Sequence, residues 1–246
     1  MNLNERAQIA RVLHQHPALS ALSTGSQERI ASTATLVRVA HRGEVALPKD
    51  AFAIVGFGLV KTTMTVGRYD FIASITGPGE TIELYEALET VRHPDARPNR
   101  PTRHTVLTES ATVVFVRPVA VLLELEGLNA VPKGAALSFA LSIGAQTNHL
   151  RERLISMTYG SSDSRIATML LDLVDHYGDT REDGTSFVPF RLTRSELAAL
   201  CGVTTETVIR KLSAWSKTGL VTDGSDGFEI RSVAELRTVS GVEALV

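Results

Sequence analysis

The chain has 246 residues, of which 43% are hydrophobic and 21% charged, and its formal net charge is -2. This length allows two domains or one large one, and the composition is that of an ordinary soluble globular protein. A single cysteine, Cys201, excludes an internal disulfide framework and a four-cysteine iron–sulfur cluster, and no apolar run is long enough to cross a membrane. The N-terminus shows no signal-peptide pattern, so we expect a cytoplasmic protein.

The first half of the chain predicts short helices followed by a β-rich domain. Residues 5–22 have the pattern of short helices. From Thr35 on, short β-like runs are separated by glycine and proline, at residues 35–39, 51–55, 59–65, 71–75 and 111–116. Several such strands in succession predict an antiparallel barrel or jelly roll. We expect this domain to span residues 1–132.

A proline-rich segment at residues 92–104 interrupts the strands and carries Arg92, Arg97, Arg100 and Arg103. Long loops without regular structure are often functional. Guanidinium groups bind phosphate and carboxylate bidentately, so this loop is a candidate site for a dianionic ligand. The alternative is a solvated surface loop without a ligand.

Residues 135–157 predict a long helix that connects the two halves of the chain. Its apolar residues recur at steps of three or four, with Thr147 as the one polar member: Phe139, Ile143, Leu150, Leu154 and Met157. This seam resembles a short coiled coil, which either pairs two chains or packs on its own barrel. We expect residues 133–160 to form this central helix and a hinge, with Asp163 capping the next helix.

Residues 192–220 predict two short helices with a sharp turn between them. Thr193 and Glu196 form a capping box at the start of the first helix, and Gly202 ends it. Thr204 caps the second helix. One face of this second helix is apolar, with Val208, Leu212 and Trp215. The opposite face carries Glu206, Ile209, Arg210, Ser213 and Lys217.

This exposed face has the residue types that read DNA bases. An arginine can bind guanine, a glutamate can accept from the cytosine amino group, and an isoleucine can contact a thymine methyl group. The net charge of -2 argues against nucleic-acid binding, but basic residues outnumber Glu196 and Glu206 between residues 191 and 217. A local basic surface is enough, because only charges near the phosphates release counterions. The alternative is an ordinary helical hairpin with a solvated polar face.

A predicted hairpin follows the two helices. The start of a strand is predicted at residues 219–221, and a returning strand at residues 228–230. Between them, residues 222–227 contain Asp-Gly twice, which is typical of a hairpin turn. A short closing helix is predicted at residues 233–236. Helix-turn-helix plus hairpin is a winged helix. The stretch from Thr193 to Val221 resembles the C-terminal DNA-binding domain of the CRP/FNR family of bacterial transcription regulators.

The first half resembles the cyclic-nucleotide-binding domain of the same family. Arg42-Gly43-Glu44 matches its first turn, Gly58-Leu59-Val60-Lys61 matches a strand, and Gly77-Pro78-Gly79-Glu80 matches the start of its phosphate-binding cassette. The resemblance therefore spans nearly the whole chain. It implies an α+β fold with an N-terminal β-roll or jelly-roll effector domain, a long dimerisation helix, and a winged helix-turn-helix domain at residues 161–246.

The cassette departs from the family pattern at two positions. Glu83 stands where cyclic-AMP binders have glycine, and Leu84 where they have the glutamate that holds the ribose. A carboxylate repels a phosphate, and leucine cannot bind a hydroxyl group. These residues argue against the usual mode of cyclic AMP binding. Cyclic di-GMP on the arginine-rich loop is another candidate, and haem with His93 or His104 as ligand is a further family option.

The resemblance implies a dimer on a palindromic operator, with RNA polymerase as a further partner, and it assigns roles to particular residues. Glu206 and Arg210 would read one G·C pair, Ile209 a thymine methyl group, and Thr205 replaces the family's first reading arginine. The phosphate anchors would be Thr193, Arg194, Ser195, Thr204 and Lys211. The effector residues would be Glu80, Thr81, Glu83, Arg97, Arg100, Arg103, Asn148 and Arg151.

An enzyme and a nucleotide-sensing module are the two other classes of function. The chain offers no nucleophile–base pair, no metal-ligand cluster and no glycine-rich phosphate loop that opens a helix, which argues against an enzyme. The remaining alternative is a nucleotide-sensing module, for instance for cyclic di-GMP, that acts mainly through protein partners.

Overall fold

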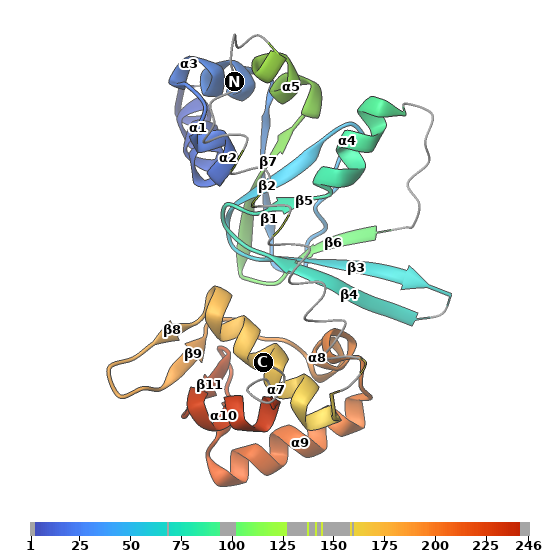
Figure 1. The fold of residues 1–246 in the computed structure, drawn as a ribbon, viewed down its shortest axis with the longest axis vertical. Coiled ribbons are helices and arrows are strands. Elements are labelled where there is room, and N and C mark those ends of the chain that lie inside the picture. The colour runs from blue at the N-terminus through green and yellow to red at the C-terminus, as the bar shows by residue number, and fades with distance from the viewer. Residues whose placement is uncertain are drawn as a thin grey trace. The chain divides into compact units, whose positions relative to one another are not determined.

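The computed structural model describes residues 3–67, 69–93, 102–126 and 160–241, together with the single residues Leu137, Leu141, Gly144 and Thr158. The chain forms two compact units, Met1–Thr147 and Asn148–Val246 (Figure 1). The predicted fold class is confirmed, because a β-sheet domain is followed by a helix-turn-helix domain with a small sheet. The predicted three-part division at residues 132 and 160 stays a prediction.

Two antiparallel sheets form the β-roll of the first unit, with strand orders β1-β7-β2-β5 and β4-β3-β6. The strands are β1 (Thr35–Ala40), β2 (Phe52–Phe57), β3 (Val60–Val66), β4 (Tyr69–Thr76), β5 (Thr81–Ile82), β6 (Thr102–Val106) and β7 (Ser110–Val116). The predicted runs coincide with β1, β2, β3, β4 and β7, with ends that differ by two residues at most. At the tight turn between β2 and β3, Gly58 has φ +78°, and a Cβ there would lie 2.2 Å from the Ser110 carbonyl oxygen, so only glycine fits.

Helices cover one side of this roll. They are α1 (Leu3–Gln15), α2 (Pro17–Ser20), α3 (Thr24–Thr33) and α5 (Pro118–Glu126), which gather at one end of the unit in Figure 1. Because neighbouring residues in a strand point to opposite faces, β2 and β7 contribute to two cores. Ile54 and Val114 pack with the helices, whereas Val55 and Val113 pack between the sheets.

The structure corrects the predicted loop at residues 92–104 at both of its ends. Arg92 is the last residue of helix α4 (Leu84–Arg92), which was not predicted. Thr102, Arg103 and His104 belong to strand β6, which pairs with β3. The prolines hid this strand, although His104 and Val106 alternate as buried residues. Residues 94–101 lie outside the described ranges.

The second unit is a winged helix. Its helices are α7 (Ser162–Tyr177), α8 (Arg194–Cys201), α9 (Thr205–Thr218) and α10 (Val233–Ser240). Its sheet has the order β10-β11-β9-β8, with strands β8 (Asp179–Thr180), β9 (Ser186–Val188), β10 (Val221–Asp223) and β11 (Phe228–Ile230). The predicted hairpin and closing helix are confirmed. Strands β8 and β9 were missed, because they are very short.

The start of α7 differs from the prediction. Ser161, not Asp163, is the N-cap, and its hydroxyl accepts a hydrogen bond from the Ser164 backbone N–H at 3.1 Å. Asp163 lies in the first turn of the helix. The residues of the predicted seam, from Phe139 to Met157, lie outside the described residues. Within the described ranges, no helix has the length and apolar character that a membrane span requires.

Candidate nucleic-acid interface and effector site

Local hydrogen bonds set both ends of α8 as predicted. The Thr193 hydroxyl accepts from the Glu196 backbone N–H at 3.2 Å, and the Glu196 carboxylate accepts from the Thr193 backbone N–H at 2.8 Å. This reciprocal capping box satisfies two backbone donors that the helix cannot use itself. Gly202 ends the helix with φ +63°, a left-handed conformation that glycine adopts without strain. The turn into α9 is thus determined by a few neighbouring residues.

Helix α9 separates a buried face from an exposed one. Thr204 caps it, since its hydroxyl accepts from the Thr207 backbone N–H at 3.3 Å. Val208, Leu212 and Trp215 are buried, as predicted. The exposed side chains are Glu206, Ile209, Arg210, Ser213 and Lys217. Ile209 is 52% exposed, which is unusual for an isoleucine without a partner surface.

Glu206 and Arg210, two charged residues on this face, are both exposed. Hydrogen bonds from its own backbone N–H and from the Thr204 hydroxyl lower the pKa of Glu206, so this carboxylate stays ionised and accepts hydrogen bonds. Arg210 is exposed, and its side chain makes no hydrogen bond or ion pair to the described part of the chain. An ionised acceptor and an uncommitted guanidinium therefore lie one helical turn apart.

Arg194 and Lys211, two predicted phosphate anchors, are already paired within the unit. Arg194 Nη2 lies 2.5 Å from Asp223 Oδ2 on β10. The other carboxylate oxygen of Asp223 is buried without a hydrogen-bond partner in the described ranges. Lys211 Nζ lies 2.6 Å from Asp163 Oδ1 on α7. Sequence reasoning missed both partners, because neither acid is near its cation in the sequence.

Arg165 adds a further link between α7 and the helix-turn-helix. Its Nε donates to the Gly160 carbonyl at 2.9 Å, and its Nη1 donates to the Gly202 carbonyl at 3.2 Å. One guanidinium thus connects Gly160, two residues before α7, with the turn between α8 and α9. No sequence pattern pointed to this role.

The predicted effector residues differ in exposure and in hydrogen-bond or ion-pair partners. Glu80 is exposed and accepts from the Gly77 backbone N–H at 2.6 Å, which closes the turn before β5. Thr81 is half-buried in β5. Arg103 pairs with Asp70 at 3.1 Å and is exposed. The remaining predicted residues, Arg97, Arg100, Asn148 and Arg151, lie outside the described residues.

Glu83 occupies a strained and partly buried position at the N-cap of α4. Its φ of +57° is left-handed, which glycine tolerates better than glutamate does. Burial, together with the neighbouring charge of Glu86, raises the pKa of Glu83 to about 7. His104 Nε2 lies 3.5 Å from its Oε1, and burial lowers the pKa of His104. Both shifts disfavour a charged pair, so the surroundings suit neutral side chains.

His104 is held by Thr62, whose hydroxyl lies 3.0 Å from its Nδ1. His104 is buried, whereas His93 is exposed at the C-terminal end of α4, so the two candidate haem ligands lie in different surroundings. Among the residues that the structure describes, no three His, Cys, Asp or Glu side chains gather as metal ligands would.

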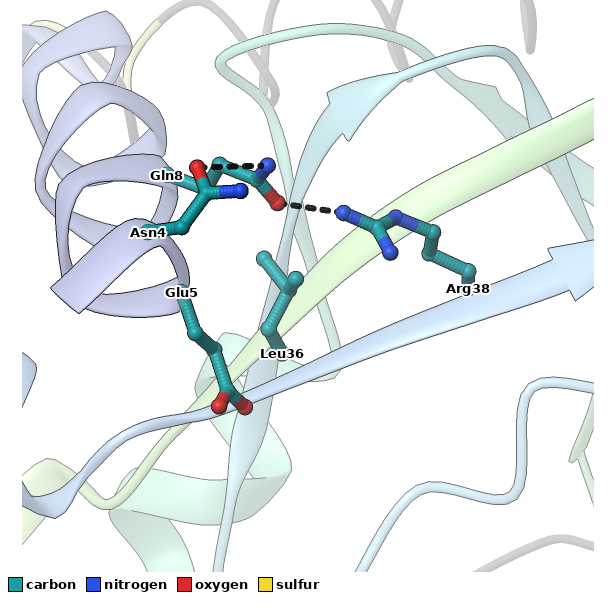
Figure 2. A pocket seen from close by; sticks show the side chains of 5 residues that line it. All are labelled: Asn4, Glu5, Gln8, Leu36 and Arg38. Atoms are coloured by element: carbon teal, nitrogen blue, oxygen red, sulfur yellow. Dashed lines mark hydrogen bonds between the residues drawn. The ribbon is translucent and has the colours of Figure 1, made fainter. Parts of the chain in front are cut away.

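A depression of about 290 Å³ lies between α1 and β1, lined by Asn4, Glu5, Gln8, Leu36 and Arg38 (Figure 2). The Gln8 side chain donates to Asn4 on the same helix at 3.4 Å. It also accepts from Arg38 on β1 at 2.5 Å, and this second bond joins the two sides of the depression. None of the predicted effector residues lines this depression.

The arrangement of α8, α9 and the wing matches a known domain. The family model of the Crp-like helix-turn-helix domain covers residues 164–239. The chain therefore carries a Crp-like helix-turn-helix domain and resembles transcription regulators of the CRP/FNR type. It is 25% identical to the transcriptional regulatory protein Btr of Bordetella pertussis over 200 residues, which is 80% of this chain and 76% of Btr.

Solved structures show the same fold over most of the regulator. FixK2 from Bradyrhizobium japonicum has a TM-score of 0.64 at 18% identity, over 84% of this chain and 97% of its own. A putative CRP/FNR-family regulator from Eubacterium rectale has a TM-score of 0.64 at 15% identity, over 92% of this chain and 99% of its own. The N-terminal unit therefore has the cyclic-nucleotide-binding-like fold of these regulators.

Proposed function

We propose that the regulator binds a palindromic operator as a homodimer and reads its sequence through α9. The observation that carries this proposal is the exposed face of α9, where Glu206 and Arg210 are charged and face solvent beside an exposed Ile209. Glu206 and Arg210 would read one G·C pair, and Ile209 a thymine methyl group. A two-fold protein matches a two-fold operator.

The phosphate contacts in this proposal come mainly from the starts of α8 and α9. Thr193 and Thr204 are N-caps, and Ser195 and Thr205 lie in the first turns. Backbone N–H groups and hydroxyls at a helix N-terminus bind phosphate oxygens well. Such contacts position the protein on the duplex, whereas Glu206 and Arg210 supply the specificity. RNA polymerase is the expected protein partner, and the cytoplasm the expected location.

Regulation would pass from the N-terminal unit through the residues around Gly160. In this scheme residues 1–132 receive the effector, residues 133–160 pair the chains, and residues 161–246 bind DNA. Effector binding and DNA binding must then strengthen or weaken each other by the same factor. The arginines Arg97, Arg100 and Arg103 make cyclic di-GMP one candidate effector. A module that acts mainly through protein partners is less favoured, because the matched domain is a Crp-like helix-turn-helix.

The test is selection of an operator from random duplexes by the full-length regulator. We expect a palindromic consensus with a G·C pair opposite α9. Arg210→Ala should weaken binding to that operator by about 1–3 kcal/mol and relax specificity at that pair. Titration of the labelled operator, measured by fluorescence anisotropy, gives the loss.

The matched control is Arg237→Ala, which removes the same charge from α10. It should leave the sequence preference unchanged. An equal loss for Arg210→Ala on the operator and on random DNA would contradict the base-reading role. Failure to select any consensus would contradict the proposed function as a whole.

A further inference from the structure

Lys211 lies within hydrogen-bonding distance of both oxygens of the Asp163 carboxylate. Its Nζ lies 2.6 Å from Asp163 Oδ1 and 2.7 Å from Oδ2. The Lys211 side chain is 26% exposed and that of Asp163 37% exposed, so this pair is partly shielded from water. Lys211 lies beside the buried Leu212 and next to Arg210, at the edge between the buried and exposed faces of α9.

The pair joins the reading helix to the first turn of α7. Arg165, in the same turn, holds the carbonyl groups of Gly160 and Gly202. Two side chains from one turn of α7 thus contact the helix-turn-helix, one at the turn and one on α9. A change in backbone geometry at Gly160 would act on α9 through both contacts.

We infer that Lys211 is a positioning residue, which holds α9 against the start of α7 and does not neutralise DNA phosphate. Asp163 is its counterpart on α7. The inference rests on the proposed function in taking α9 as the reading helix. Arg210 and Lys217, whose side chains make no ion pair to the described part of the chain, remain available for DNA.

The first test needs no DNA. Trp215 is the only tryptophan of the chain and is buried on α9, so its fluorescence reports unfolding of the DNA-binding unit in the full-length protein. Urea unfolding is followed for wild type, Asp163→Asn, Lys211→Met and the double variant. We expect each single variant to lower the midpoint, and the double variant to lower it no further than the larger single effect.

The control replaces Lys217, on the same helix, by methionine. Lys217→Met should change the midpoint independently of Asp163→Asn, so that the two effects add. Additive effects of Asp163→Asn and Lys211→Met would overturn the inference, because uncoupled residues do not hold each other.

The second test uses the selected operator at several salt concentrations. Asp163→Asn and Lys211→Met should each reduce affinity about two- to fivefold, as expected for loss of one partly exposed ion pair. The operator affinity of the double variant should be no lower than that of the single variant with the lower affinity. The slope of log affinity against log salt should stay that of the wild type.

A phosphate anchor would behave differently. If Lys211→Met reduces the salt slope by about one and Asp163→Asn does not, Lys211 contacts phosphate and the inference is wrong. If wild type selects no operator, the proposed function fails, while the urea experiment still decides whether the two residues are coupled.

Discussion

At the scale of single residues, Glu83 shows most clearly what a family pattern leaves open. The pattern marked it as a glutamate in place of a glycine, and the structure gives it the left-handed backbone that glycine favours. The side chain is placed against His104 and near Glu86, and burial raises its pKa to about 7. The position therefore carries an acid that titrates close to neutral pH.

This shift predicts a pH dependence of stability with a definite sign. The folded-state pKa of Glu83, about 7, lies above its ordinary value of 4.5, so the folded chain holds this proton more tightly than the unfolded chain does. The contribution of Glu83 to the free energy of unfolding therefore falls as pH rises from about 4.5 to about 7, and stays at its lower level above that. Glu83→Gln stays neutral throughout. We expect it to raise the melting temperature of the N-terminal unit at pH 8 and to change it little near pH 4.5.

Thermal melts from pH 4.5 to 8 measure this difference. Glu89→Gln, on the same helix, is the matched control and should keep the wild-type profile. A lower melting temperature of Glu83→Gln at pH 8 would show that the folded protein needs the carboxylate anion.

At the scale of elements, the helix ends of the DNA-binding unit follow from short-range sequence patterns. The capping box at Thr193, the left-handed Gly202 and the cap at Thr204 were all predicted and are present. Each needs residues no more than a few positions apart, so the sequence contains the whole interaction. Helix α4 and strand β6 were missed for the opposite reason. α4 begins after a left-handed glutamate, and β6 depends on pairing with β3.

The capping box makes a measurable contribution to the stability of this unit. Thr193→Ala removes the hydroxyl that accepts from the Glu196 backbone N–H. We expect it to lower the free energy of unfolding by about 0.5–2 kcal/mol. Trp215 fluorescence during urea unfolding measures the loss. Ser213→Ala, an exposed position within α9, should lie within about 0.5 kcal/mol of wild type. Equal losses in both variants would mean that the cap is not the cause.

At the scale of the whole molecule, the two units raise the question of what the N-terminal one detects. Its fold is that of cyclic-nucleotide-binding-like domains, but Glu83 and Leu84 stand in the cassette positions. Where Glu83 is ionised its carboxylate repels a phosphate, and Leu84 cannot bind a ribose hydroxyl.

We therefore expect cyclic AMP to leave the melting temperature of the full-length protein unchanged. A ligand present at about 100 times its dissociation constant would stabilise the folded state by about 2.7 kcal/mol, which is readily detected. Cyclic GMP and cyclic di-GMP are measured in parallel. A shift with cyclic di-GMP alone would support the role of the arginine-rich segment. A shift with cyclic AMP would contradict the interpretation of Glu83 and Leu84.

The sequence by itself predicted the class of this protein and the exposed face of α9 that we propose meets DNA. Hydrophobic periodicity, helix caps and turn residues are local, so they can be found without coordinates. Only the tertiary structure decided which basic side chains of this unit form ion pairs within the described part of the chain. Arg194 and Lys211 look identical in the sequence to uncommitted phosphate anchors, but folding brings Asp223 and Asp163 against them. Lys211 and Asp163 are 48 positions apart, and no local pattern encodes a contact over that distance.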